Sequence, residues 1–235
     1  MTAFVTSFVQ SQSAMRRAAL VPEIDLHLAH DPHLIFREVR DFNESHPELP
    51  VYPPYWAFAW PGGQAMARHI LDTPTLIEGL RIADIGAGSG IASIAAIKAG
   101  AAHVFAVDVD PLAAAAIALN AEANGVAAAI DISTEDCLGE IPSVDMILIS
   151  DLVYEPELAV RVGAFLERVL AAGLPVIIGD RLTARCPARG FVEVARYDAP
   201  LTPALDDDDA ELGRIWHCRP RRRGTPRAPR TKATP

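Results

Sequence analysis

The stretch Arg81-Ile82-Ala83-Asp84-Ile85-Gly86-Ala87-Gly88-Ser89-Gly90 decides the fold of this chain. Its apolar first half predicts a buried strand, and three glycines at alternate positions predict a tight turn after it. The apolar pattern of residues 91–99 then predicts a helix that Gly100 ends. A second apolar run, 104–107, leads into Asp108, which lies 18 residues beyond Gly90. This unit is typical of a nucleotide site, in which glycines admit the ligand to the backbone and the acid meets ribose hydroxyls.

The spacing of the glycines separates two classes of nucleotide site. A dinucleotide fingerprint reads GxGxxG, whereas Gly86, Gly88 and Gly90 read GxGxG and position 91 is an isoleucine. The leading acid, Asp84, does not suit a pyrophosphate because both are anionic, but it suits a ligand with a cationic amino group. The pattern resembles motif I of the class I S-adenosylmethionine methyltransferases. The alternatives are a nicotinamide or flavin site and a glycine turn without a ligand.

The charges and cysteines of the 235-residue chain limit its partners and compartment. The net charge is −9, and residues 219–235 hold seven basic residues and no acid, which leaves −16 for the rest. An acidic body argues against nucleic acid as the main substrate, and the basic, proline-rich tail predicts disorder. Three widely spaced cysteines predict neither a disulfide framework nor a zinc site, so a reducing compartment fits. No apolar run approaches the ~20 residues of a membrane span.

Three segments are predicted: residues 1–50 as an N-terminal helical or substrate-side segment, 51–218 as the catalytic domain, and 219–235 as the tail. Residues 1–20 predict an amphipathic helix packed on the domain, with a mitochondrial presequence as the alternative. Residues 22–50 predict an edge hairpin or a substrate-side loop, with a metal site at 25–31 as the alternative. The connector 51–64 holds five of the fifteen aromatic residues and predicts a pocket wall, with a packing plug as the alternative.

Apolar strands alternate with helical patterns through the rest of the chain. Asp110 and Pro111 predict the start of a helix over 112–123, and a second helix is expected over 157–172. Further strands are expected at 127–133, 144–150 and 174–179. The last two strands, 191–197 and 211–218, are joined by an acidic loop at 206–209 and are expected to pair antiparallel. The pattern predicts an α/β fold with a doubly wound, mostly parallel seven-stranded sheet, helices on both faces and an antiparallel edge strand.

The predicted ligand lies where the strands end, and its parts require different residues. Gly86, Gly88 and Gly90 allow close approach of the methionine part, and Asp84 is expected near its ammonium group. Asp108 is expected to accept from the ribose hydroxyls, because its competitor Asp110 is better used as a helix cap. The expected residues at the adenine are Asp136, which would accept from the amino group, and Cys137, which would pack on the ring.

The reactive end is predicted at Asp151-Leu152-Val153-Tyr154-Glu155. Methyl transfer from a sulfonium needs a positioned neutral nucleophile and the exclusion of water. A carboxylate from Asp151 or Glu155 could hold a lysine amine and relay its proton, and Tyr154 offers an apolar wall with a polar tip. The alternative is that Asp151 and Glu155 only cap the next helix.

A linked set of motifs carries a narrower resemblance: the segment 53–63 (PPYWAFAWPGG), the glycine turn, 108–111, 120–125 and 151–155. The set resembles the seven-β-strand protein lysine methyltransferases, and within them the electron transfer flavoprotein β-subunit lysine methyltransferases. The resemblance implies S-adenosylmethionine as cofactor, lysines of the flavoprotein β-subunit as substrate, Trp60 at the cofactor's methionine end, and Asp151 with Tyr154 at the substrate lysine.

The same resemblance implies a soluble enzyme. With the acidic body and the absence of a long apolar run, we expect no nucleic-acid or membrane partner, and we expect a monomer. We expect a bacterial cytoplasm as its location, or the mitochondrial matrix if the source is eukaryotic. The alternative functions are methylation of another protein lysine, for example on a ribosomal protein, or of a small amine, and a catalytically silent cofactor-binding partner protein.

Overall fold

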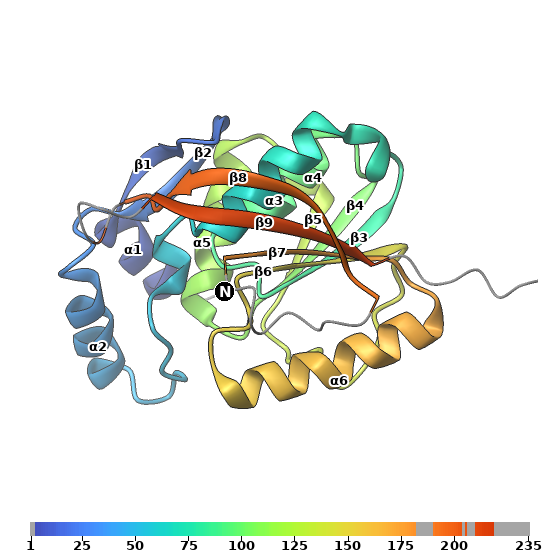
Figure 1. Cartoon of the computed structure of the whole chain (residues 1–235). Helices are drawn as coiled ribbons and strands as arrows, with labels where there is room; N and C mark the ends of the chain where they lie inside the picture. The colour runs from blue at the N-terminus through green and yellow to red at the C-terminus, as the bar shows by residue number, and fades with distance from the viewer. Residues whose placement is uncertain (1–2, 182–189, 204, 206–209, 219–235) are drawn as a thin grey trace, which may run out of the picture.

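A seven-stranded sheet forms the centre of the molecule, with helices on both faces (Figure 1). The computed structural model describes residues 3–181, 190–203, 205 and 210–218. The strand order is β5-β4-β3-β6-β7-β9-β8. Their bounds are β3 Arg81–Ile85, β4 His103–Val107, β5 Ile130–Ser133, β6 Met146–Ser150, β7 Val176–Asp180, β8 Val192–Pro200 and β9 Ala210–Cys218. Strands β3 to β7 pair in parallel, and β9 pairs antiparallel with both β7 and β8. The predicted fold class is confirmed, and β8 forms the outer edge beside the antiparallel β9.

Alternate residues of the central strands supply two apolar cores. On one face, Ile82 and Leu148 pack with α3 (Pro61–Asp72), α4 (Ile91–Lys98) and part of α5 (Pro111–Ala123). On the other face, Ala83 and Ile147 pack with α6 (Pro156–Ala172). Because the central strands β3, β6 and β7 are covered on both faces, their sequences are mostly apolar rather than alternating, and their few polar residues include Asp84 and Asp180.

The N-terminal part adds a hairpin and two helices to one end of this domain (Figure 1). It consists of α1 (Ala3–Gln12), β1 (Ser13–Ala18), β2 (Val21–Ala29) and α2 (Ile35–Ser45). The predicted first helix is confirmed over residues 3–12, where Val5 and Val9 are buried in one cluster with residues of α5. The helix prediction is wrong for 13–18. The Ser13 hydroxyl donates to the carbonyl of Val9, and the chain then pairs with β2.

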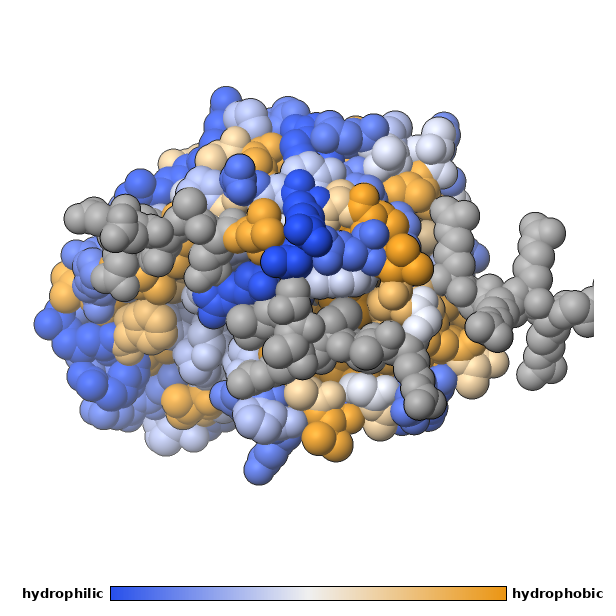
Figure 2. Space-filling view, in the orientation of Figure 1, coloured by the Kyte–Doolittle hydropathy of each residue, from blue (hydrophilic) through white to orange (hydrophobic). Residues whose placement is uncertain are grey.

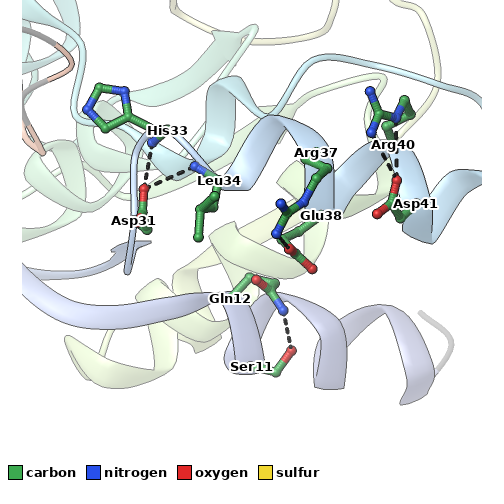
Figure 3. A network of polar contacts seen from close by, with 9 residues as sticks. All are labelled: Ser11, Gln12, Asp31, His33, Leu34, Arg37, Glu38, Arg40 and Asp41. Atoms are coloured by element: carbon green, nitrogen blue, oxygen red, sulfur yellow. Dashed lines mark hydrogen bonds and ion pairs between the residues drawn. The ribbon is translucent and has the colours of Figure 1, made fainter.

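The segment 22–50 contains the predicted hairpin strand β2 and also the unpredicted helix α2. Pro32 and Pro47 flank α2 and do not interrupt it. Asp31 accepts from the backbone N–H groups of His33 and Leu34 just before α2 begins, and Asp25 forms an ion pair with Arg17 (Figure 3 shows the Asp31 contacts). These acids therefore have structural partners. Within the described ranges, no group of three or more His, Cys, Asp or Glu side chains is arranged to hold a metal ion.

The outer edge of the sheet is mixed in polarity. Along β8 the residues alternate between exposed and half-buried, and hydrophobic and hydrophilic groups are interspersed over this part of the surface (Figure 2). Among the described residues, no helix has the length and apolar character needed to cross a membrane. The predicted basic tail at 219–235 and the acidic loop at 206–209 lie outside the described residues.

Candidate active site

A cavity of about 580 Å³ lies at the carboxyl ends of β3, β4, β6 and β7. This volume is within the usual range for small-ligand sites. Nine of the eleven predicted site residues line it: Trp60, Gly86, Gly88, Asp108, Asp136, Cys137, Asp151, Tyr154 and Glu155. Asp84 and Gly90 do not line the cavity. Residues from five separate segments are thus brought together where the sequence analysis placed them, at one edge of the sheet.

The backbone of the glycine turn adopts left-handed conformations that residues with a side chain rarely adopt. Gly86, Gly88 and Gly90 have φ angles of 72°, 54° and 77°. A Cβ on Gly88 would meet no atom within 4 Å, whereas one on Gly86 would lie 2.6 Å from a methyl group of Leu152. Gly88 therefore exposes bare backbone to the cavity, and Gly86 permits close packing beside it.

The carboxylate of Asp108 holds this turn from the neighbouring strand. Its Oδ2 accepts from the N–H of Gly88 at 2.8 Å, and its Oδ1 accepts from the N–H of Asp110 at 3.1 Å. Burial raises the pKa of Asp108. Asp110 caps α5 as predicted, accepting from the N–H of Leu112 at 2.8 Å, and burial raises its pKa to about 7.

Asp84 lies behind the turn instead of in the cavity. It is 1% exposed, and its Oδ2 accepts from the hydroxyl of Ser93 at 2.6 Å. Its Oδ1 is buried without a hydrogen-bond partner. Burial raises the pKa of Asp84 to about 6, and the hydrogen bond from Ser93 opposes that rise. Two buried acids, Asp84 and Asp110, and the half-buried Asp108 thus lie close to one another, and a cationic group nearby would stabilise their charged forms.

Asp136 and Cys137 line the cavity beyond the end of β5. Asp136 accepts from the N–H of Leu138 at 3.0 Å and forms an ion pair with Arg161 of α6. Although burial opposes it, these two interactions lower the pKa of Asp136. Cys137 is a half-buried free thiol whose pKa is raised by burial. The Asp136 carboxylate therefore already has two partners, the N–H of Leu138 and the guanidinium of Arg161.

The aromatic connector serves both of the purposes considered for it. Trp56 and Phe58 are 1% exposed and fill the core between α1, α2 and α5. Tyr55 and Trp60 line the cavity, and the indole N–H of Trp60 donates to the carbonyl of Tyr55 at 2.8 Å. The Tyr55 ring also meets Tyr154 edge-on, with ring centroids 4.9 Å apart. Aromatic rings from two distant segments therefore form one wall.

The carboxylate of Asp151 does not cap the helix that follows it. Its Oδ2 accepts from the N–H of Gly63, at the start of α3, at 2.9 Å. Its Oδ1 is buried and makes no hydrogen bond, and the residue has a φ of 47°. Burial and the nearby charge of Asp180 raise the pKa of Asp151 to about 7. Glu155 stands at the N-cap position of α6 without a side-chain capping bond.

Other cavity residues were not singled out individually from the sequence, among them Tyr55, Asp180 and Arg181. Asp180 is 3% exposed and ends β7. The same rule that selected Asp84, Asp108 and Asp151, an acid where an apolar strand ends, would have found it. The guanidinium of Arg181 lies over the ring of Trp60, 5.6 Å from its centroid. Nothing in the local sequence predicts that contact.

Residues 65–154 match the family described as ribosomal protein L11 methyltransferase (PrmA). The chain is 38% identical over 224 residues to the electron transfer flavoprotein beta subunit lysine methyltransferase of Danio rerio, covering 92% of this chain and 81% of that protein. The chain belongs to the electron transfer flavoprotein β-subunit lysine methyltransferase family. The PrmA match begins within α3 and stops at Tyr154.

Two solved structures share the fold of this lysine methyltransferase family member. A putative RNA methyltransferase of Pyrococcus horikoshii superposes with a TM-score of 0.55 at 17% identity, covering 78% of this chain and 98% of that one. Magnesium protoporphyrin IX methyltransferase from Synechocystis, solved with S-adenosylmethionine bound, gives 0.50 at 16% identity, covering 67% of this chain and 80% of that one. At these identities the likeness concerns the fold alone.

Proposed function

We propose that this protein is an enzyme that transfers methyl groups from S-adenosylmethionine to lysine side chains of the electron transfer flavoprotein β-subunit. The observation that carries the proposal is a single cavity whose lining combines two chemically different groups of residues. The first group is the bare backbone of Gly88 with the carboxylate of Asp108, and the second is Asp151 with Tyr154. Family membership supports both the methyl transfer and the protein substrate.

The residues of the glycine turn fit the cofactor. S-adenosylmethionine, when bound, supplies a methyl group activated by its sulfonium. The bare backbone at Gly88 admits the methionine part, and the carboxylates of Asp84, whose Oδ1 has no hydrogen-bond partner, and of Asp108 favour a cationic ligand nearby. Asp108 retains lone pairs on both oxygens for hydroxyl donors, and Asp136 with Cys137 would border the base.

The substrate lysine would be bound and oriented by Asp151, Tyr154 and Glu155. The amine must be neutral to attack a methyl carbon, so its ammonium has to release a proton. Oδ1 of Asp151 is available to accept a hydrogen bond from that ammonium, while Oδ2 stays on Gly63. The Tyr55–Tyr154 wall would pack along the methylene stem, and Glu155 would favour entry of a cation. The proton would leave to solvent at the mouth of the cavity.

The test offers purified flavoprotein, ribosomal protein L11 and small amines in parallel to the enzyme with radiolabelled S-adenosylmethionine, followed by mass spectrometry of the protein lysines. We expect label on lysines of the β-subunit. Label confined to ribosomal protein L11 or to small amines would replace the substrate assignment, and binding without transfer to any of them would point to a silent partner. The proposal includes action as a monomer in a reducing compartment, and the free thiols of Cys137 and Cys218 fit a reducing compartment.

A further inference from the structure

Two asparagines, one in the last turn of α5 and one at its C-cap, have no role in the site described above. Asn120 and Asn124 lie one helical turn apart and belong to the motif 120–125. Asn120 is fully buried. A buried amide that satisfies its hydrogen bonds is a rigid connection between the groups that it joins, so the partners of Asn120 indicate what it holds.

Asn120 joins the cofactor turn to the N-terminal hairpin. Its Nδ2 donates to the carbonyl of Ser89 at 2.8 Å, and its Oδ1 accepts from the N–H of His27, on β2, at 2.6 Å. Ser89 is 4% exposed and lies between Gly88, which lines the cavity, and Gly90, the left-handed residue before α4. The amide therefore reaches the turn between two glycines with left-handed backbone.

Asn124 also bonds the backbone of β2, but it makes no hydrogen bond to the glycine turn. Its Oδ1 accepts from the N–H of Asp25 at 3.1 Å, and its Nδ2 donates to the carbonyl of the same residue at 2.6 Å. Both asparagines thus hold β2 on α5 at alternate residues. Only Asn120 also bonds Ser89. A comparison of variants at the two positions can therefore distinguish the loss of a contact to the hairpin from the loss of a contact to the turn.

The turn is fixed from two sides. Asp108 accepts from the N–H of Gly88 on the cavity side, and Asn120 donates to the carbonyl of Ser89 from the core side. Three left-handed glycines give the turn many alternative conformations, so a ligand that binds only one of them loses affinity when the others become populated. Loss of the amide would also leave the buried Ser89 carbonyl without this donor.

We propose that Asn120 is a positioning residue for the cofactor, which holds the glycine turn in its binding conformation by tying Ser89 to the hairpin residue His27. The inference rests on the proposed function, because it assumes that S-adenosylmethionine meets this turn. It gives the N-terminal hairpin a part in cofactor binding, although the hairpin contributes no residue to the lining of the cavity.

The experiment is calorimetric titration of S-adenosylhomocysteine into the full chain, with thermal unfolding of each variant alongside. For Asn120→Ala we expect affinity about 10-fold weaker than wild type, and a raised KM for S-adenosylmethionine with kcat little changed. Asn124→Ala is the matched control, and its affinity should stay within about 2-fold of wild type while its melting temperature also falls.

Asn120→Asp keeps the size of the side chain, so it provides a second test if Asn120→Ala does not fold. The introduced carboxyl can accept from His27 at any pH, but it can donate to Ser89 only when protonated. We expect its affinity relative to wild type to recover as the pH is lowered from about 8 to about 5.5. Wild-type affinity in Asn120→Ala, or equal weakening in Asn124→Ala, would overturn the inference. Absence of binding by the wild type would instead remove the proposed function, and the inference with it.

Discussion

The carboxylate of Asp151 accepts a hydrogen bond from the backbone N–H of Gly63, 2.9 Å away and 88 residues earlier in the chain. This bond ties the end of β6 to the first turn of α3, whose N-cap residue is Trp60. The first turn of a helix has free N–H groups and a partial positive charge, so a carboxylate is stabilised there. One oxygen is thereby fixed, and the other remains buried without a partner. The bond therefore links the segment that contains Trp60 to the segment that contains Asp151, and both residues line the cavity.

Asp151→Asn tests the charge at this position without removing the bond. The amide oxygen can still accept from Gly63, so α3 should stay in place, but the variant cannot hold an ammonium ion as a carboxylate does. We expect kcat to fall about 100-fold with unchanged affinity for S-adenosylhomocysteine. Asp145→Asn is the control, since Asp145 accepts from the N–H of Arg81 and does not line the cavity. Full activity of Asp151→Asn would contradict its assigned role.

Gly88→Ala should separate ligand binding from stability. A side chain at φ 54° costs ~1 kcal/mol, and the added methyl group would point into space that the ligand needs. We expect a folded protein that has lost measurable affinity for S-adenosylhomocysteine. Gly125→Ala carries the same kind of strain at φ 70°, also with no atom near the new Cβ, but it lies outside the cavity. Equal loss of affinity in both variants would assign the effect to strain alone.

Asp110→Asn should stabilise the protein at neutral and alkaline pH. The folded-state pKa of Asp110, about 7, is above the ordinary value of 3.8, so the folded state binds the proton more tightly than the unfolded state. That contribution to stability is complete below the ordinary pKa and is lost as the pH rises through about 7. Asparagine also caps helices well. Near pH 8 we expect the variant to gain ~2 kcal/mol in free energy of unfolding, and little near pH 4, by urea denaturation. A gain that is independent of pH would exclude this cause.

Tyr55→Leu should weaken binding of the protein substrate and spare the cofactor. The Tyr55 ring meets both Tyr154 and Trp60 edge-on, so its loss opens the aromatic wall. We expect KM for the flavoprotein to rise about 10-fold, with the affinity for S-adenosylhomocysteine unchanged. Tyr55→Phe retains the ring and should behave as wild type. A fall in cofactor affinity in Tyr55→Leu would instead place the ring at the methionine end.

The sheet and the glycine turn were predictable because their signals are local. Strands covered on both faces are apolar throughout, and a left-handed turn requires glycine, so the run from Arg81 to Gly90 shows both features directly. Asp110 was assigned correctly as a cap for the same reason, since its partner Leu112 is two residues away.

Features that depend on distant contacts were not predictable. Helix α2 is held by the stacking of Phe42 on Phe8 of α1, a contact that no local pattern in 22–50 indicates. The strand end places Asp84 near the turn, but only the direction of its side chain, toward Ser93 of α4, removes it from the cavity lining. The bond from Gly63 to Asp151 likewise exists only in the folded chain.

A crystal structure of the protein with S-adenosylhomocysteine tests the central claim most directly. The account predicts the ribose hydroxyls on Asp108, the amino-acid part along the backbone of Gly88, and the sulfur facing Asp151 and Tyr154 across open space for a lysine amine. A ligand bound elsewhere, or a sulfur separated from Asp151 by packed side chains, would contradict it.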